Sequence, residues 1–169
     1  MDQSIINFAV YEDDTEFCGM AEATLPDLSS LTETISGAGI AGNFEIPIIG
    51  HFDAMSLTLN FRTHTEESLN LCKPGYHTIQ LYEAVQNSNR TAGTLDVKQA
   101  RHVFKVIPKT YKAGKVAPAE SAGASGEYAV HYWATYIDGD KVLEVDPENF
   151  ICEMDGTDYL ADVRSALGK

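Results

Sequence analysis

The sequence predicts a mainly β protein, an antiparallel β sandwich or barrel with two short α-helices. The clearest evidence is segment 55–62, in which Met, Leu, Leu and Phe alternate with polar residues at a strict period of two. Further runs of strand-forming residues follow, separated by turn signals such as Asp138-Gly139. Strands and helices do not alternate regularly, which argues against a doubly wound α/β sheet.

The first half of the chain is expected to form five strands and one helix. The polar residues 12–15 should form a hairpin turn between the first two strands. Thr63 and Thr65 are both possible N-caps of a short helix at about residues 65–72, which Lys73-Pro74-Gly75 would end. The expected strands cover residues 6–11, 16–25, 31–36, 43–50 and 55–62.

The second half is expected to form five more strands and a C-terminal helix. Thr157 should cap this helix, and its Leu160, Val163 and Leu167 form one stripe that would pack on the barrel. The turn-rich residues 88–93 should separate two long strands. The expected strands cover residues 76–87, 101–112, 127–137, 141–145 and 149–154.

The strand expected at residues 127–137 is apolar or aromatic on both faces. Such a strand is covered on both sides, or its second face meets a partner. Strict alternation would place Tyr128, Val130, Tyr132 and Tyr136 on one side, and Ala129, Trp133 and Ile137 on the other.

Length and composition indicate a single domain, residues 1–169, with two glycine-rich loops. The first loop spans residues 36–43, and the second is an exposed, flexible Ala/Gly/Ser insertion at residues 113–127. The 25 acidic residues exceed the 12 Lys and Arg and give a formal net charge of −13. This balance argues against a protein that grips nucleic-acid phosphates, which requires clustered cations.

The N-terminus and the cysteines indicate where the protein is made. The N-terminus carries no basic region and only a short apolar stretch, so we expect no signal peptide. No window approaches the roughly 18 apolar residues of a membrane span. Cys18, Cys72 and Cys152 are odd in number and far apart, so we expect reduced thiols and synthesis in a cytoplasm.

The stretch SGAGIAG at residues 36–42 matches the G-x-G-x-x-G fingerprint of dinucleotide-binding enzymes. That fingerprint must open a helix, but the next residues, NFEIPIIG, favour a strand, and Pro47 would break a helix. Segment 138–149 fails as a calcium-binding EF-hand loop because Leu143 occupies the position of the required Gly. The five histidines lack zinc-ligand spacing. We therefore expect no enzymatic activity, no cofactor and no metal.

Three segments together resemble the major tail tube proteins of contractile-tailed bacteriophages and of R-type, phage-tail-like bacteriocins. The first, Thr24–Phe61, has a TLPKL-like opening, a glycine-rich loop and a G-acidic-AM element within residues 50–55. The second, at residues 112–150, combines a K-x-G loop, a tyrosine-rich strand and a hairpin that starts with DG and ends with DP. The third, DGTDYLADVRSALGK at residues 155–169, is similar to the family's ending, with Asp155 in place of the usual Asn.

This resemblance implies a tail-tube-like fold and a structural role. Proteins of the family form hexameric rings that stack into a hollow tube inside a contractile sheath, and strands of six subunits line the lumen as one β barrel. The implied partners are further copies of the chain, a sheath protein, and baseplate and tape-measure proteins. The tube is a conduit for DNA in a phage, without specific binding, or punctures a membrane in a bacteriocin. The implied location is the virion tail or bacteriocin particle, made in a bacterial cytoplasm, with no membrane insertion of the subunit.

The same resemblance suggests residues for contacts between subunits or rings. A loop that orders only when the next ring docks needs small, permissive residues, which suits Gly37, Gly39 and Gly42. Asp138 and Asp146, which start and end the DG…DP hairpin, are the other two candidates.

Part of the negative charge is expected to face the lumen. Like charges disfavour adsorption, so an acidic lumen would let DNA slide without sticking. The candidates are acids on the polar sides of long strands, namely Glu45, Glu83 and Asp96.

Two other interpretations stay open at this point. A type VI secretion-like tube protein would share the architecture but matches the motifs less well. A ligand-binding β sandwich, such as a carbohydrate-binding module, would use an exposed aromatic platform, for which Tyr132, Trp133 and Tyr136 are candidates.

Overall fold

The computed structural model describes residues 2–13, 15–17, 19–89 and 91–169. The strands are β1 (Asp2–Glu12), β2 (Thr15–Glu16), β3 (Met20–Thr24), β4 (Ser30–Ile35), β5 (Phe44–Phe52), β6 (Met55–Phe61), β7 (His77–Asn89), β8 (Thr94–Lys112), β9 (Ala124–Ile137), β10 (Asp140–Asp146), β11 (Ile151–Met154) and β12 (Thr157–Asp158), and the helices are α1 (Glu66–Asn70) and α2 (Ala161–Ala166). The expected mainly β, antiparallel fold with two short helices is confirmed.

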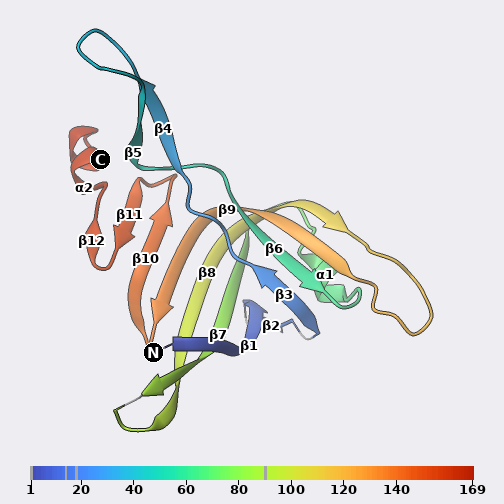
Figure 1. The fold of residues 1–169 in the computed structure, drawn as a ribbon. Helices are drawn as coiled ribbons and strands as arrows, with labels where there is room; N and C mark the ends of the chain where they lie inside the picture. The colour runs from blue at the N-terminus through green and yellow to red at the C-terminus, as the bar shows by residue number, and fades with distance from the viewer. Residues whose placement is uncertain (1, 14, 18, 90) are drawn as a thin grey trace.

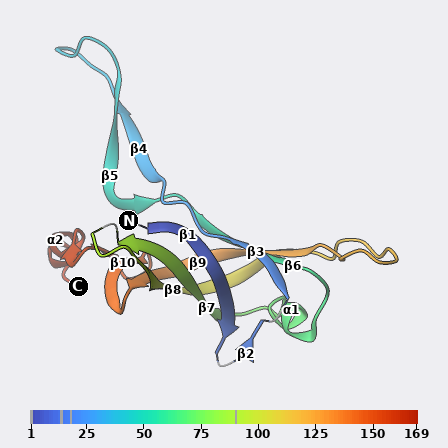
Figure 2. The same cartoon turned by 60° about the horizontal axis from the view of Figure 1, so that its bottom comes forward.

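The strands form one large sheet and one small sheet. The large sheet has the order β12-β11-β10-β9-β8-β7-β1-β2, and β6 pairs with β9 and with β3. It curls strongly, and α1 lies at the end where β3 and β6 are found (Figure 1). The small sheet is the β4–β5 hairpin alone, which stands away from the rest of the molecule in both views (Figures 1 and 2).

The hydrophobic core is built on β6 and the long strands that follow it. β6 keeps the predicted alternation: Met55, Leu57, Leu59 and Phe61 are buried and the residues between them are partly exposed. Burying a side chain of this size stabilises the fold by roughly 1.5–3 kcal/mol. The later strands add Ile79, Leu81, Phe104, Val106, Tyr128, Val130, Trp133 and Val145.

Helix α1 forms where the sequence predicted it. Thr65 is the N-cap: its hydroxyl accepts a hydrogen bond from the backbone N–H of Ser68, and the Ser68 hydroxyl accepts one from the N–H of Thr65, each at 3.1 Å. This capping box satisfies two backbone donors that the first turn leaves unpaired. Neither described helix has the length or the apolar character that a membrane-crossing helix requires.

The alternation expected for β9 is wrong beyond His131. The pairing of β8 with β9 shifts between Lys105 and Val106, so that β9 contains a β-bulge there. A bulge adds one residue and reverses which face the next side chains occupy. Trp133 therefore joins Tyr128 in the core, while Tyr132 lies on the opposite face.

Several expected element boundaries are also corrected. The strand expected at residues 16–25 is interrupted, and the chain resumes as β3 at Met20; Cys18, like Asp14 of the expected first turn, lies outside the described residues. β7 runs to Asn89 and β8 starts at Thr94, so the hairpin turn is shorter than expected. β9 starts at Ala124, which leaves only residues 113–123 to the expected insertion.

The C-terminal segment differs most from its prediction. Thr157 lies in β12, and the N-cap of α2 is Leu160, which makes no side-chain capping bond. No residue of α2 is buried, and Leu167 is 55% exposed, so the expected packing of the helix on a barrel is wrong. Leu160 alone, just before the helix, is buried at 2% exposure.

Candidate interaction surfaces

The β4–β5 hairpin has one apolar face that no other part of the described chain covers. Ile35 pairs with Phe44, and Glu33 pairs with Ile46, so these four side chains share a face. Phe44 and Ile46 are 46% and 42% exposed. Thr34 and its partner residue 45 lie on the other face.

The hairpin is as apolar as a buried element, but its residues are not buried. No residue from Ser30 to Phe52 is buried. Its only Asp, Glu, Lys or Arg residues are Glu33 and Glu45, both acidic. An isolated two-stranded hairpin is at best marginally stable in water, and a large exposed apolar patch is typical of a protein–protein interface. The exposed large apolar residues are Leu31, Ile40, Phe44, Ile46, Ile48 and Ile49.

The base of the hairpin rests against the C-terminal segment. Gly50 has a φ of +68°, and a Cβ atom there would lie 2.5 Å from Cδ2 of Leu160. Only glycine allows this approach, because any side chain would overlap Leu160 and would also strain the left-handed backbone. The N–H of Asp53 donates to the carbonyl of Ser29 at 2.8 Å, which closes the base of the hairpin.

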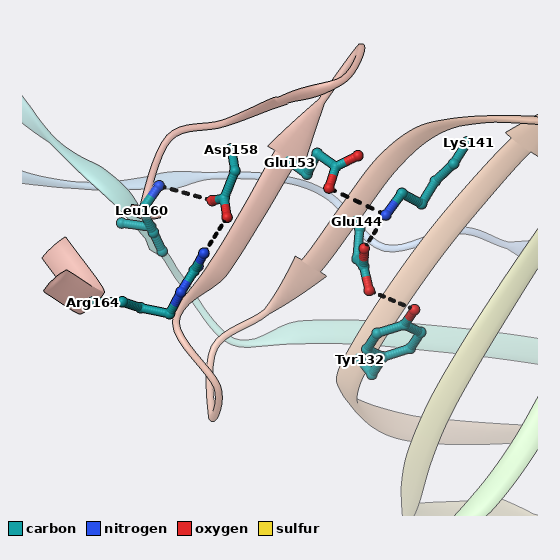
Figure 3. A network of polar contacts seen from close by, with 7 residues as sticks. All are labelled: Tyr132, Lys141, Glu144, Glu153, Asp158, Leu160 and Arg164. Carbon is teal, nitrogen blue, oxygen red and sulfur yellow. Dashed lines mark hydrogen bonds and ion pairs between the residues drawn. The ribbon is translucent and has the colours of Figure 1, made fainter. Parts of the chain in front are cut away.

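A polar network fixes the strands next to this segment (Figure 3). The Lys141 ammonium donates to Glu144 at 2.5 Å and to Glu153 at 3.2 Å, across β10 and β11. Both hydrogen bonds raise the pKa of Lys141, and the one to Glu144 has the larger effect. The Tyr132 hydroxyl donates to Glu144 at 3.0 Å. Burial makes the largest contribution to raising the pKa of Tyr132, and this hydrogen bond raises it further. The carboxylates of Glu144 and Glu153 therefore both have a cationic partner within the same chain.

A second network holds the start of α2 (Figure 3). Arg164 donates to Asp158 at 2.5 Å and to the carbonyl of Phe150 at 2.6 Å. The hydrogen bond from Arg164 lowers the pKa of Asp158. Asp158 also accepts a 3.0 Å hydrogen bond from the N–H of Leu160. The chain around Leu160 is therefore positioned by ionic contacts, although α2 itself buries nothing.

The outer face of β7–β9 carries an arginine held by tyrosines. The guanidinium carbon of Arg101 lies 4.8 Å from the ring centre of Tyr136 and 6.0 Å from that of Tyr82, within the range of cation–π attraction. Its Nε is buried and has no hydrogen-bond partner among the described residues. The sequence does not predict this cluster, although Arg101 and Tyr136 both lie in strand-forming runs, because the pairing of distant strands brings them together.

On the same face, β8 carries exposed apolar residues. The β7–β8 register is continuous, so Leu95, Val97, Gln99 and Arg101 all point to one side. Leu95 and Val97 are 68% and 66% exposed. We call the surface formed by Tyr82, Leu95, Val97, Gln99, Arg101 and Tyr136 the Arg101 face.

The glycines singled out by the sequence lie at the tip of the β4–β5 hairpin. Gly39 and Gly42 have φ values of +93° and +131°, whereas Gly37 has no positive φ. A Cβ atom at any of the three would meet nothing within 4 Å. These glycines therefore shape an open loop and do not relieve crowding inside the subunit.

Asp138 and Asp146 both bond within their own chain. A carboxylate oxygen of Asp138 accepts a 3.1 Å hydrogen bond from the N–H of Gln99, and Asp138 and Gly139 adopt the positive φ values of the predicted hairpin turn. Asp146 accepts hydrogen bonds from the backbone N–H and the side chain of Asn149, at 3.1 and 2.7 Å. Each aspartate stabilises a turn at one end of β10.

The three candidate acids do not form one cluster. Glu45 is exposed on the hairpin, on the face opposite Ile46, and Asp96 is exposed near the β7–β8 turn. The expectation that Glu83 lies on a polar side is wrong. Glu83 shares the face of Leu81, its side chain is 14% exposed, and it lies 3.5 Å from Nε2 of His102.

The described residues offer little support for a ligand site. Trp133 is 8% exposed, so it cannot join Tyr132 and Tyr136 in the aromatic platform that a carbohydrate-binding module would need. No cluster of three or more His, Cys, Asp or Glu in the described part of the chain is arranged to hold a metal ion.

Comparison with known proteins gives a consistent result. The family model described as "Phage tail tube protein FII" matches residues 2–168. A search of curated protein sequences finds no match.

Two solved structures share the fold. One is a chain described as "Extracellular Contractile Injection System, PVC sheath/tube terminator in extended state", with a TM-score of 0.54 and 14% identity over 79% of this chain and 96% of that chain. The other is described as "PVC sheath-tube complex in extended state", with a TM-score of 0.51 and 15% identity over 76% of this chain and 87% of that chain.

Proposed function

The chain belongs to the phage tail tube protein FII family and is a structural subunit of a tail tube, and from this premise we propose that its copies form hexameric rings that stack inside a contractile sheath. The observation that carries the proposal is the β4–β5 hairpin. Its apolar side chains Phe44, Ile46 and Ile48 are all exposed in the single subunit. A hairpin of this kind gains stability when a neighbouring subunit covers it.

Unpaired strand edges supply the second requirement, a continuous wall. β1 pairs with β7 along its length, but β2 covers its other edge only at Tyr11 and Glu12. β12 likewise covers only two residues of β11. Exposed edges of this length template the addition of a further strand, and a neighbouring subunit would provide it. Closing the circle in this way removes every free edge from the lumen wall.

The hairpin tip is the proposed contact between rings. Gly37, Gly39 and Gly42 leave the loop free of side-chain bulk, so the backbone can approach the next ring. Asp138 and Asp146 would contribute through the turns that they shape.

The charge of the subunit fits a passive conduit. We propose that Glu45 and Asp96 face the lumen, because both are exposed and neither has an ion pair among the described residues. A lumen lined by carboxylates would repel DNA and let it pass without binding. Replacing both acids with Lys should slow DNA delivery by a phage particle. Unchanged delivery would rule out this assignment.

The partners follow from the same arrangement. The structures that share the fold are described as a sheath/tube terminator and a sheath–tube complex, which supports a sheath protein as partner of this chain. We further propose baseplate and tape-measure partners, a non-enzymatic role, and a place in a phage tail or bacteriocin particle.

Negative-stain electron microscopy of the concentrated protein tests the central proposal. We expect rings and hollow tubes with sixfold end views. Rings with another symmetry would overturn the hexamer, and a chain that stays monomeric at all concentrations would overturn self-assembly. The purified subunit should also be tested with a baseplate template, because a template supplies the first ring.

A further inference from the structure

Building on the proposed tube, we propose that the β4–β5 hairpin of one copy docks on the Arg101 face of another copy, with Glu33 meeting Arg101. The proposal deepens the tube function by naming the surface that receives the hairpin. It rests on matching strand length, apolar character and charge between two surfaces of the same chain.

The hairpin defines what its receptor must offer. Its exposed face combines Phe44 and Ile46 with the carboxylate of Glu33. Glu33 has no ion pair or hydrogen bond among the described side chains, and residues 30–52 contain no Lys or Arg. Burying that carboxylate in an interface is strongly unfavourable unless a cation meets it. The receptor must therefore present apolar residues beside an available cation.

The Arg101 face meets both conditions. Leu95 and Val97 supply exposed apolar surface on the same side of β8 as Arg101. Arg101 is held between Tyr82 and Tyr136 and has no carboxylate partner in the described part of the chain. Four other cations do have such partners: Lys109 pairs with Glu127, Lys115 with Glu120, Lys141 with Glu144 and Glu153, and Arg164 with Asp158.

Position and size also agree. The hairpin and the β7–β8 turn project from opposite ends of the subunit, so one molecule cannot satisfy both surfaces by itself (Figure 1). Contact between two different surfaces of identical chains is head-to-tail, and repeats of it generate rings or stacks. Leu31 to Ile35 and Val97 to Arg101 are each five residues long, and the four steps between their ends cover about 13 Å of strand.

A nucleic-acid phosphate is a less suitable occupant of the Arg101 face. Phosphate binding depends on several clustered cations. The chain carries a net charge of −13, and the next cation on this side of β8, Lys105, lies four residues from Arg101 and stands over the ring of Tyr132. Apolar residues next to one cation match the hairpin better than they match a polyanion.

Charge reversal tests the contact. Glu33→Arg and Arg101→Glu are made singly and together. The controls are Thr34→Arg, on the opposite hairpin face, and Lys105→Glu, four residues further along the same side of β8. Tube yield is measured by sedimentation and electron microscopy, and folding by circular dichroism. Each single reversal should lower the yield about tenfold or more, because it leaves two like charges facing each other. The double variant should recover to within about twofold of wild type, and both controls should assemble normally.

The outcomes separate this contact from the tube itself. If wild type forms tubes and the double variant is no better than the worse single variant, the contact is wrong and the tube stands. Normal assembly of Arg101→Glu with weaker binding of a fluorescent DNA duplex would assign the face to phosphate and overturn the proposal. A wild-type chain that never assembles would overturn the proposed function and this contact with it.

Disulfide trapping gives a second test that does not depend on charge. Glu33→Cys combined with Arg101→Cys should form an oxidised ladder of subunits on a denaturing gel. Each single Cys variant controls for the native thiols. Absence of the ladder from tubes that assemble normally would contradict the contact.

Discussion

Strands β5 and β6 are neighbours in the chain and similarly apolar, yet they have opposite fates. Every second residue of β6 is buried, whereas β5 buries none. The difference lies in their surroundings, because β6 has β3 on one side and β9 on the other, while β5 pairs with β4 alone among the described strands. An apolar strand pattern thus indicates that a strand will be covered, but not whether its own subunit or another copy covers it.

The largest expected effect comes from truncating one apolar residue in each strand. Leu57→Ala should lower the free energy of unfolding by about 2–5 kcal/mol, because Leu57 is fully buried. Ile46→Ala should change it by less than about 0.5 kcal/mol and should instead reduce tube yield. Urea denaturation and sedimentation measure the two quantities. An equal loss of stability in both variants would show that the hairpin is already covered in the monomer.

The next effect concerns the boundary between the two regions. Gly50→Ala should destabilise the subunit by about 1–3 kcal/mol, because the new methyl group overlaps Leu160 and the φ of +68° disfavours alanine. Gly37→Ala, in open space without a positive φ, is the control and should change stability by less than about 0.5 kcal/mol. Thermal or urea unfolding distinguishes them. Equal effects would mean that the hairpin base does not rest on Leu160.

A smaller effect should appear as a pH dependence in the body of the subunit. Burial lowers the pKa of His77, but hydrogen bonds to the Lys73 carbonyl at 2.9 Å and to Glu12 outweigh it and raise the pKa overall. A raised folded-state pKa gives stability that is fully present below the unfolded value near 6.5 and is lost as pH rises through the folded value.

The stability difference between wild type and His77→Gln should therefore be larger at pH 5 than at pH 8. Urea denaturation at both values measures it. Because the pair joins β1 to β7, the effect belongs to the body, and a hairpin variant such as Ile46→Ala should not alter it. A difference that grows toward pH 8 would contradict the assigned role.

The smallest effect on folding is expected at the hairpin tip. Gly39→Val should leave the unfolding free energy within about 1 kcal/mol of wild type, since the loop is exposed, but should block ring stacking because valine strongly disfavours a φ of +93°. Gly37→Val lacks that conflict and should stack better. Electron microscopy reports stacking. Normal tubes from Gly39→Val would remove the loop from the proposed ring contact.

Local patterns determined much of the fold. The alternation of β6, the Thr65 cap and the Asp138-Gly139 turn depend on neighbouring residues, and each was predicted from the sequence. Their physical causes, side-chain period, backbone capping and positive φ, all lie within a few residues of chain. The family resemblance, later confirmed by the family match, supplied the tube role that these local patterns alone would not indicate.

Features that depend on pairing between distant strands were missed. The bulge in β9 is visible only in its register with β8, and it moved Trp133 into the core. The sequence suggests that Glu83 faces outward, but it lies on the inner face of the sheet beside His102, which is 19 residues away in sequence. The Arg101 face is formed by residues of three strands, β7, β8 and β9. Sequence spacing carries none of these relationships directly.

The two ends of the hairpin have a mechanical consequence for a tube that is driven forward. Residues 25–29 connect β3 to β4, and residues 53–54 connect β5 to β6. β3 and β6 pair with each other. If a neighbouring subunit binds the hairpin and pulls on it, the force would pass along the backbones of β4 and β5 into the paired strands β3 and β6. The pair would then pull lengthwise against β9, across seven paired residues from Met55 to Phe61. Strands loaded along their length must break their hydrogen bonds together and not one at a time, so the subunit would resist tearing when its neighbour pulls.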